Sequence, residues 1–439
     1  MTMGSRASNP QGAGRRARWM RNGFLSLWLA LLVGVTILLA IGGRPDPAGL
    51  GQPLDRLWRF HPGDDPAWAD PALDDRGWDR ITLVSRPELN DGDVGIPGYF
   101  DGWRAHGHPD LSGYGWYRRE VALPAKGDVV LLGPPIVDDG YQMFWNGRPI
   151  GGIGRLSGTP KVNATRPWLA YLPASNGART GLLAIRAYMQ PGERDGKSGG
   201  LRTVPIVAPR VQGEALHGAQ WRRTIAGYVV DAAEPVAMLV LAAMAILAAP
   251  RLTRPEFARW IALGLVASAC LRAGNAIGAW TDLRSQTAQA WQNAVIFAPL
   301  AKLGWTMAWN RWTDGRERRF VSVAALAGWG LATFGALIQS AEIGGTARAV
   351  FALGLVVIAV RILRHGKNRL LALGTLLLTA TGLFAADLSA LGVPGIWFPF
   401  NIGVSRSQYA YALALPLLAL ALFTPERAEV ARGHSLPHG

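Results

Sequence analysis

The chain has 439 residues, of which 49% are hydrophobic and only 17% are charged, and its formal net charge is +15. Soluble domains carry about 25% charged residues, so the composition argues against one large soluble enzyme and against a disordered chain. The single cysteine, Cys270, excludes a disulfide framework and a cysteine-based metal site within one chain.

The hydrophobic residues fall into blocks that are long enough to cross a membrane. A transmembrane helix needs about 20 apolar residues to cross about 30 Å of hydrocarbon. Eight blocks of 18 to 25 residues meet this requirement, and each predicts a helix. The predicted spans are 24–42, 225–249, 260–280, 290–310, 320–340, 346–363, 370–391 and 407–424.

The first block has no charged residue and follows a basic stretch that contains Arg15, Arg16, Arg18 and Arg21. This pattern is typical of a signal sequence, which is either cleaved or kept as a membrane anchor. Small residues at the end of the block offer only a faint cleavage site. We therefore favour an uncleaved signal anchor over a cleaved signal peptide.

Basic residues predict how the spans are oriented. With a cytoplasmic N-terminus, the inner segments hold 17 Lys and Arg residues and the short outer loops hold 2. This bias places the tails 1–23 and 425–439 in the cytoplasm and the segment 43–223 outside. Arg outnumbers Lys by 40 to 5, which favours a GC-rich bacterial genome, so we expect the inner membrane and a periplasmic 43–223.

The excess of positive charge therefore has a membrane explanation. The inner face of the predicted helical region suits anionic lipid headgroups of the bilayer. No basic stripe with interleaved aromatic residues is present, so we expect no nucleic-acid partner.

The outer segment 43–223 predicts an all-β domain. Its short runs are rich in β-branched and aromatic residues and are separated by Pro, Gly, Asp and Asn. No helical periodicity competes, and Asn146-Gly147 predicts a tight hairpin. About 180 residues of short strands favour a sandwich or jelly roll. The predicted strands are 57–60, 81–84, 116–123, 128–133, 141–145, 181–188 and 202–208.

Three stretches of this segment carry a family resemblance. They read LWRFHPGDDPAWADPALDDRGWDRITL, GYGWYRREVALP and GPPIVDDGYQMFWNGRPIGGIG. Their order resembles a galactose-binding-like jelly roll, as in the sugar-binding domain of glycoside hydrolase family 2 enzymes. It is equally similar to the extracellular domain of bacterial seven-transmembrane receptors with diverse intracellular signalling modules.

The order of the domains separates these two resemblances. Family 2 enzymes carry their catalytic carboxylates on a separate barrel, whereas here seven predicted spans, 225–424, follow the jelly roll. One span, an outer β domain and seven spans match the receptor architecture. Such receptors continue into a kinase, cyclase or phosphatase, and the tail 425–439 is too short for a folded domain. We therefore expect a separately encoded cytoplasmic signalling protein as partner.

Candidate ligand-binding residues are aromatic rings that can stack on sugar faces, and polar groups that can bond hydroxyls. The alternative is that most of these rings form the core of the sandwich. The long loop 90–112 is the best candidate segment, and its His106 and His108 are more simply explained as solvated than as metal ligands. The candidates are Tyr99, Asp101, Trp103, Tyr117, Arg118, Asp138, Asp139, Trp145 and Asn146.

Charged residues inside the predicted spans form a second set of candidates. Because a charge in hydrocarbon is costly, it is normally paired. Asp231, Glu234 and Asp387 lie toward the outer side, as does Arg272. We predict a polar network in which Arg272 pairs with one of the acids, either to transmit movement or only to hold helices together.

Two functions remain open at this point. The first is a non-enzymatic receptor whose jelly roll binds a carbohydrate-like or other small ligand. The second is a membrane enzyme, carrier or scaffold of envelope polysaccharide handling, with the jelly roll as a sugar-binding module. Few charged residues lie at mid-depth of the spans, which favours the receptor over a transporter. No motif predicts a cofactor or a metal.

Overall fold

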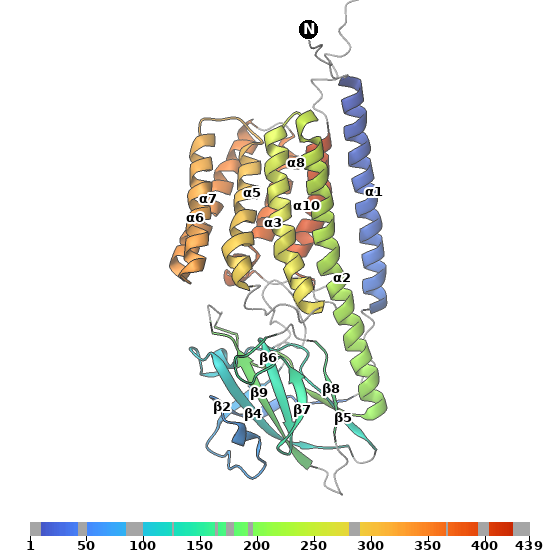
Figure 1. Cartoon of the computed structure of the whole chain (residues 1–439), viewed down its shortest axis with the longest axis vertical. Coiled ribbons are helices and arrows are strands. Elements are labelled where there is room, and N and C mark those ends of the chain that lie inside the picture. The colour runs from blue at the N-terminus through green and yellow to red at the C-terminus, as the bar shows by residue number, and fades with distance from the viewer. Residues whose placement is uncertain are drawn as a thin grey trace, which may run out of the picture.

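The computed structural model consists of a β part and a helical part that is made of apolar helices (Figure 1). The β part lies at one end of the helices. The structure describes residues 10–42, 51–84, 100–124, 127–162, 166–172, 180–191, 196–280, 290–365, 368–393 and 404–424.

The β part contains two antiparallel sheets. The smaller sheet has the strand order β1-β10-β5-β8, and the larger has the order β3-β2-β4-β9-β6-β7. The strands are β1 (Gln52–Pro53), β2 (Arg56–Pro62), β3 (Asp79–Leu83), β4 (Gly113–Ala122), β5 (Val129–Leu132), β6 (Gly140–Trp145), β7 (Arg148–Ile153), β8 (Leu169–Tyr171), β9 (Thr180–Met189) and β10 (Ile206–Pro209).

The two sheets enclose one hydrophobic core, to which β2 and β4 of the larger sheet and β5 and β10 of the smaller sheet contribute. Side chains alternate along β4, so Tyr117 enters this core while Trp116 packs on the opposite face. The predicted hairpin is confirmed. Asn146 and Gly147 join β6 to β7, and both have positive φ, at 47° and 80°.

The helices of the helical part run from the end that faces the β part to the opposite end, which we call the far end (Figure 1). Six helices of the described chain are long and apolar enough to cross a membrane, and α8 is a shorter apolar helix. The helices are α1 (Pro10–Gly42), α2 (Arg210–Ala248), α3 (Pro255–Trp280), α5 (Ala298–Asn310), α6 (Arg318–Leu337), α7 (Ala341–His365), α8 (Arg369–Leu383), α9 (Ala385–Ala390) and α10 (Arg406–Phe423).

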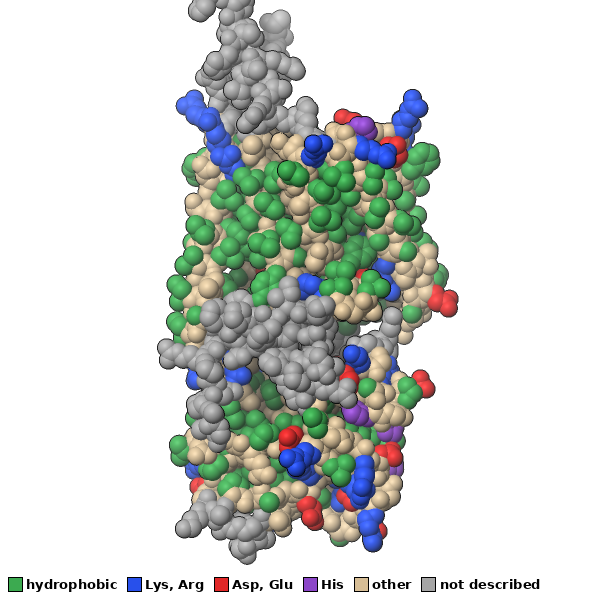
Figure 2. All heavy atoms as spheres, turned by 180° about the vertical axis from the view of Figure 1, so that it is seen from behind, with side chains coloured by type: hydrophobic (Ala, Val, Ile, Leu, Met, Phe, Trp, Pro, Cys, Tyr) green, Lys and Arg blue, Asp and Glu red, His purple; other side chains and the backbone are tan. Residues whose placement is uncertain are grey.

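Large apolar side chains cover the outer surface of these helices (Figure 2). Leu353 of α7 and Leu370 of α8 are 66% and 82% exposed, and similar residues line α1 and α6. A soluble protein rarely exposes so large an apolar surface. The exposed surface of the helical part is therefore that of a membrane protein.

Helix α2 differs from the prediction. Its first turns, 210–223, were assigned to the all-β segment, but α2 begins at Arg210 directly after β10. Leu216 of α2 packs on Val130 and Leu132, which are the outward side chains of β5. The stretch 210–223 has only three large apolar residues, Val211, Leu216 and Trp221, so its helical periodicity is weak. Tertiary packing against the smaller sheet supplies the missing stabilisation.

Two other predicted spans are interrupted. The span 370–391 breaks at Phe384, between α8 and α9. The span 290–310 contains a π-helical turn at Asn293–Phe297, just before Pro299. Proline has no N–H, so the carbonyl four residues earlier loses its helical donor. The hydroxyl of Thr333 on α6 donates to that carbonyl, of Val295, at 3.3 Å.

The missing N–H of a proline also explains how α1 docks on α10. Pro416 inside α10 leaves the carbonyl of Ala412 without its helical donor. Nε1 of Trp28 on α1 donates to this carbonyl at 3.2 Å. Phe24 and Trp28 are also buried in the core of the helical part. Helix α1 therefore packs as an integral part of the bundle.

We predict that Gly213→Ala destabilises the protein. A Cβ at this position would clash with Cγ2 of Val130, and overpacking costs about 1–3 kcal/mol. Gly218→Ala is the matched control on the same helix, because its Cβ would meet only the flexible end of Arg222 at 3.6 Å. The control should stabilise the protein by about 0.5–1 kcal/mol. Thermal unfolding of the full chain in detergent measures both, and equal effects would contradict the contact between α2 and the sheet.

We also predict that Trp28→Phe is less damaging when Pro416 is replaced. In the natural background, the variant leaves the Ala412 carbonyl without a donor, at a cost of about 1–3 kcal/mol. In Pro416→Ala, the new backbone N–H serves that carbonyl, and only the packing loss of the smaller ring remains. A double-mutant cycle on thermal stability isolates the difference, and additive effects would show that the hydrogen bond contributes nothing.

Candidate functional site

Four of the predicted ligand residues, Asp101, Trp103, Tyr117 and Asp138, lie together at one rim of the sandwich. This rim joins the segments 100–104, 136–138 and 197–202, and the Tyr117 ring packs beneath it. The backbone N–H groups of Gly102 and Trp103 donate to the carbonyls of Lys197 and Gly199 at 2.7 and 2.9 Å. Asp138 accepts from the Gly199 N–H at 2.5 Å and forms an ion pair with Arg202 at 3.0 Å.

The two aromatic residues of this rim are in the core. Trp103 and Tyr117 are 0% and 1% exposed, and both contact the backbone of Gly199 or Gly200. Burial raises the pKa of the Tyr117 hydroxyl, so it stays neutral. These rings present no face to solvent and cannot stack on a sugar. Two candidates of this rim keep partial exposure: Asp101, on the described part of the long loop, and Asp138.

The other predicted ligand residues have structural roles elsewhere. Arg118 is 1% exposed and pairs with Asp75 at 2.9 Å, while its guanidinium also donates to carbonyls of the segment 68–73. It therefore fastens this segment to the larger sheet. Trp145 is buried in the core. Tyr99 lies outside the described residues.

Asp139 and Asn146 stabilise the backbone around them. Asp139 has a φ of 74°, and its carboxylate accepts the Gln190 N–H at 2.6 Å. The side-chain oxygen of Asn146 accepts the Leu182 N–H at 2.8 Å. The side chains of Asp139 and Asn146, like those of Arg118 and Asp138, are therefore engaged with the protein itself.

The predicted polar network inside the helical part is centred on α2, α3 and α10. Nη1 of Arg272 lies 3.1 Å from Oε2 of Glu234, and the two side chains are 16% and 6% exposed. The guanidinium also stands over the ring of Tyr411, 5.0 Å from its centroid. Among the three candidate acids, Glu234 is therefore the ion-pair partner of Arg272.

Asp231 joins the same cluster through the start of α10. Ser405 and Gln408 form a capping box, in which Oε1 of Gln408 accepts the Ser405 N–H at 2.7 Å. Nε2 of the same Gln408 donates to Asp231 at 2.6 Å. One amide thus caps α10 and ties it to α2.

Asp387 differs from the expectation, because it forms an ion pair with Arg348 of α7 at 2.9 Å and has no described contact with Arg272. Arg348 lies inside the predicted span 346–363 and was not among the predicted members of the network. It lies close enough to the start of α7 for its charge to remain 42% exposed.

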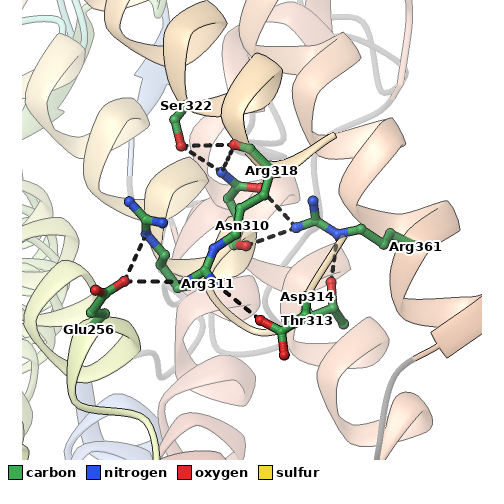
Figure 3. A network of polar contacts seen from close by, with 8 residues as sticks. All are labelled: Glu256, Asn310, Arg311, Thr313, Asp314, Arg318, Ser322 and Arg361. Atoms are coloured by element: carbon green, nitrogen blue, oxygen red, sulfur yellow. Dashed lines mark hydrogen bonds and ion pairs between the residues drawn. The ribbon is translucent and has the colours of Figure 1, made fainter. Parts of the chain in front are cut away.

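A second polar network lies at the far end of the helices and was not predicted (Figure 3). Arg361 of α7 is 4% exposed and donates to the Asn310 carbonyl and side chain, both at 2.8 Å, and to Thr313 at 2.6 Å. Nδ2 of Asn310 donates in turn to the Arg318 carbonyl at 2.9 Å. This network fixes the turn between α5 and α6.

Within the described residues, no group of three or more His, Cys, Asp or Glu side chains could hold a metal ion. His108 instead lies 3.4 Å from Asp79 and packs on Phe60.

Comparisons with known proteins give only weak similarities. No protein-family model matches the chain, and no curated protein sequence matches it. Among solved structures, β-glucuronidase 2 of Bacteroides uniformis is 21% identical over 36% of this chain and 18% of its own, with a TM-score of 0.27. A glycosyl hydrolase family 2 member of Bacteroides cellulosilyticus is 21% identical over 36% of this chain and 20% of its own, at 0.25. The chain spans about a fifth of the length of these proteins.

We predict that Arg272→Ala lowers the stability of the full chain in detergent by about 3 kcal/mol, because it removes the cation beside a buried carboxylate. Adding Glu234→Gln should recover part of this loss. The matched control is Asp387→Asn, whose effect should add to that of Arg272→Ala within about 0.5 kcal/mol. Double-mutant cycles of thermal unfolding measure both. An additive cycle for Glu234 would show that the ion pair is not formed.

Proposed function

We propose that the chain is a receptor of a bacterial inner membrane. Its β part is a galactose-binding-like jelly roll that lies in the periplasm and binds a carbohydrate-like or other small ligand. Its helical part, a seven-helix bundle preceded by α1, relays the change to a separate cytoplasmic signalling protein.

The observation that carries this proposal is the continuity of α2. It follows β10 with no linker, and its 39 residues make a helix about 58 Å long at 1.5 Å per residue. Leu216 is packed on the smaller sheet, while Glu234 lies in the polar cluster of the helical part. A tilt of the sheet therefore moves α2 as a lever, with no flexible joint at the boundary between the two parts.

The polar cluster supplies the coupling between helices. On α2, Glu234 forms an ion pair with Arg272 of α3, and Asp231 accepts a hydrogen bond from Gln408 of α10. When α2 moves, these partners either move with it or lose their contacts. Losing the contacts costs free energy, because charged and polar groups would then be unpaired in an apolar environment. The cluster thus turns a movement of one helix into a rearrangement of three.

The positions of basic residues at the helix ends support the proposed orientation in the membrane. Within the described residues, the basic residues predicted to face the cytoplasm lie in the first half of α1 and at or near the turns from α2 to α3, from α5 to α6 and from α7 to α8. All these segments lie at the end opposite the β part, where Lys and Arg side chains are visible (Figure 2). With the positive-inside rule, this supports the proposed location of the β part outside the cytoplasm.

Hydrogen exchange of the full chain in lipid nanodiscs tests the proposal, with galactose, glucose and glucuronate as probes. We expect a binding sugar to slow exchange in 100–112 and 196–202. We also expect it to change exchange in the first turns of α2 and around Arg272, because α2 transmits the movement.

The matched control is the double variant Glu234→Gln with Arg272→Gln. It should keep the protection at the rim and lose the change in α3. A response confined to the β strands would contradict the relay, and no response to any of the three sugars would contradict carbohydrate binding.

A further inference from the structure

Three charged side chains from three helices meet toward the end that faces the β part: Lys302 of α5, Arg348 of α7 and Asp387 of α9. Nε of Arg348 lies 2.9 Å from Oδ1 of Asp387. The ammonium group of Lys302 lies over the ring of Phe384, 5.8 Å from its centroid. Asp387 attracts this ammonium group and Arg348 repels it. Two cations therefore compete for one carboxylate.

Lys302 is the cation that lacks a counter-ion in this arrangement. Within the described part of the chain, its ammonium group forms no hydrogen bond and no ion pair. The side chain is partly buried and belongs to the predicted span 290–310. A charge inside a membrane is costly and is normally paired, and a contact with an aromatic ring compensates only part of the cost. Lys302 therefore gains free energy if Asp387 turns toward it.

Asp387 lies on a short helical segment that is bounded by two breaks. Helix α9 covers only Ala385–Ala390. Neither Phe384 before it, with φ −113° and ψ 27°, nor Leu391 after it, with φ −81° and ψ 5°, has regular helical geometry. Residues at the ends of an element commonly absorb the dihedral changes of a hinge. A turn of α9 about Phe384 moves the carboxylate relative to α7 and α5.

The start of α10 holds α9 in its present position. Arg406 is 5% exposed, and its guanidinium donates to the Ala385 carbonyl and to the Ser389 hydroxyl, both at 2.8 Å. Two residues later on the same helix, Gln408 donates to Asp231 of α2 at 2.6 Å. A movement of α2 can therefore reach α9 through the first turn of α10.

We propose that Asp387 is an exchangeable counter-ion, which pairs with Arg348 in this structure and with Lys302 in a second state, after α9 has turned. The exchange moves one ion pair from α7 to α5. These two helices meet again at the far end, where Arg361 of α7 donates to Asn310 of α5, so a change in their relative position extends to that end. As a step of a relay, the exchange rests on the proposed receptor function.

Thermal unfolding of the full chain in detergent tests the exchange without any ligand. In the natural chain, Lys302→Met removes a costly charge and should raise the Tm by about 2 °C. With Arg348→Gln, Asp387 turns to Lys302, so the same Lys302→Met strands a carboxylate and should lower the Tm by a similar amount. Adding Asp387→Asn to that double variant should recover part of the loss.

Arg364→Gln is the matched control. It removes the same charge from an exposed position on the same helix, and it should leave the effect of Lys302→Met unchanged. Where Arg348→Gln fails to fold, the natural chain still decides, because a lower Tm of Lys302→Met alone would show that Lys302 is already paired.

The proposal is overturned when Lys302→Met shifts the Tm in the same direction with Arg348 and with Arg348→Gln. It is also overturned when Arg364→Gln reverses the effect as Arg348→Gln does, because Lys302 then responds to general charge. These outcomes are independent of the sugar experiment. If no sugar binds while the reversal is observed, the exchange stands and only its role in a receptor is lost.

Discussion

The arrangement of the whole molecule depends on one helix that belongs to both of its parts. Without α2, the outward face of β5 would expose Val130 and Leu132, and Glu234 would not meet Arg272. Gly213 permits this double role, because any side chain there would push the helix off the sheet. The β part and the helical part are therefore mechanically joined at 210–223.

Much of the fold could be predicted from local patterns. Strand periodicity, the Asn146-Gly147 turn and the apolar blocks are short-range signals, and they correspond to strands and helices of the structure. The first turns of α2 carried only a weak signal, because they hold few large apolar residues and their helix depends on a sheet that lies elsewhere in the sequence. The interruptions at Phe384 and before Pro299 also depend on neighbouring helices, which supply partners such as Thr333.

The candidate site was less accessible to sequence reasoning. The cost of a charge in hydrocarbon predicts that Arg272 has an acidic partner, but only the rotation of α2 decides between Asp231 and Glu234. The capping box of Ser405 and Gln408 was not predicted, nor was the contact of the same amide with Asp231. Aromatic residues gave no means to separate core from ligand surface, as the buried Trp103 shows. A cavity at the far end of the helices is lined by residues of 253–257 and 311–318 and by His365, three separate stretches of chain that no local motif connects.

The hydrogen bond between Trp28 and the Ala412 carbonyl also has a consequence for the order in which the helices can pack during synthesis. A ribosome makes α1 before the other described helices and α10 after them, and yet these two lie side by side. Helix α1 packs on both α2 and α10, so it can dock on α2 early, but its contact with α10 must wait until α10 has left the ribosome. Closure of the helical part is therefore a late step, and a chain stopped before residue 406 lacks one of the two helices on which its first helix packs.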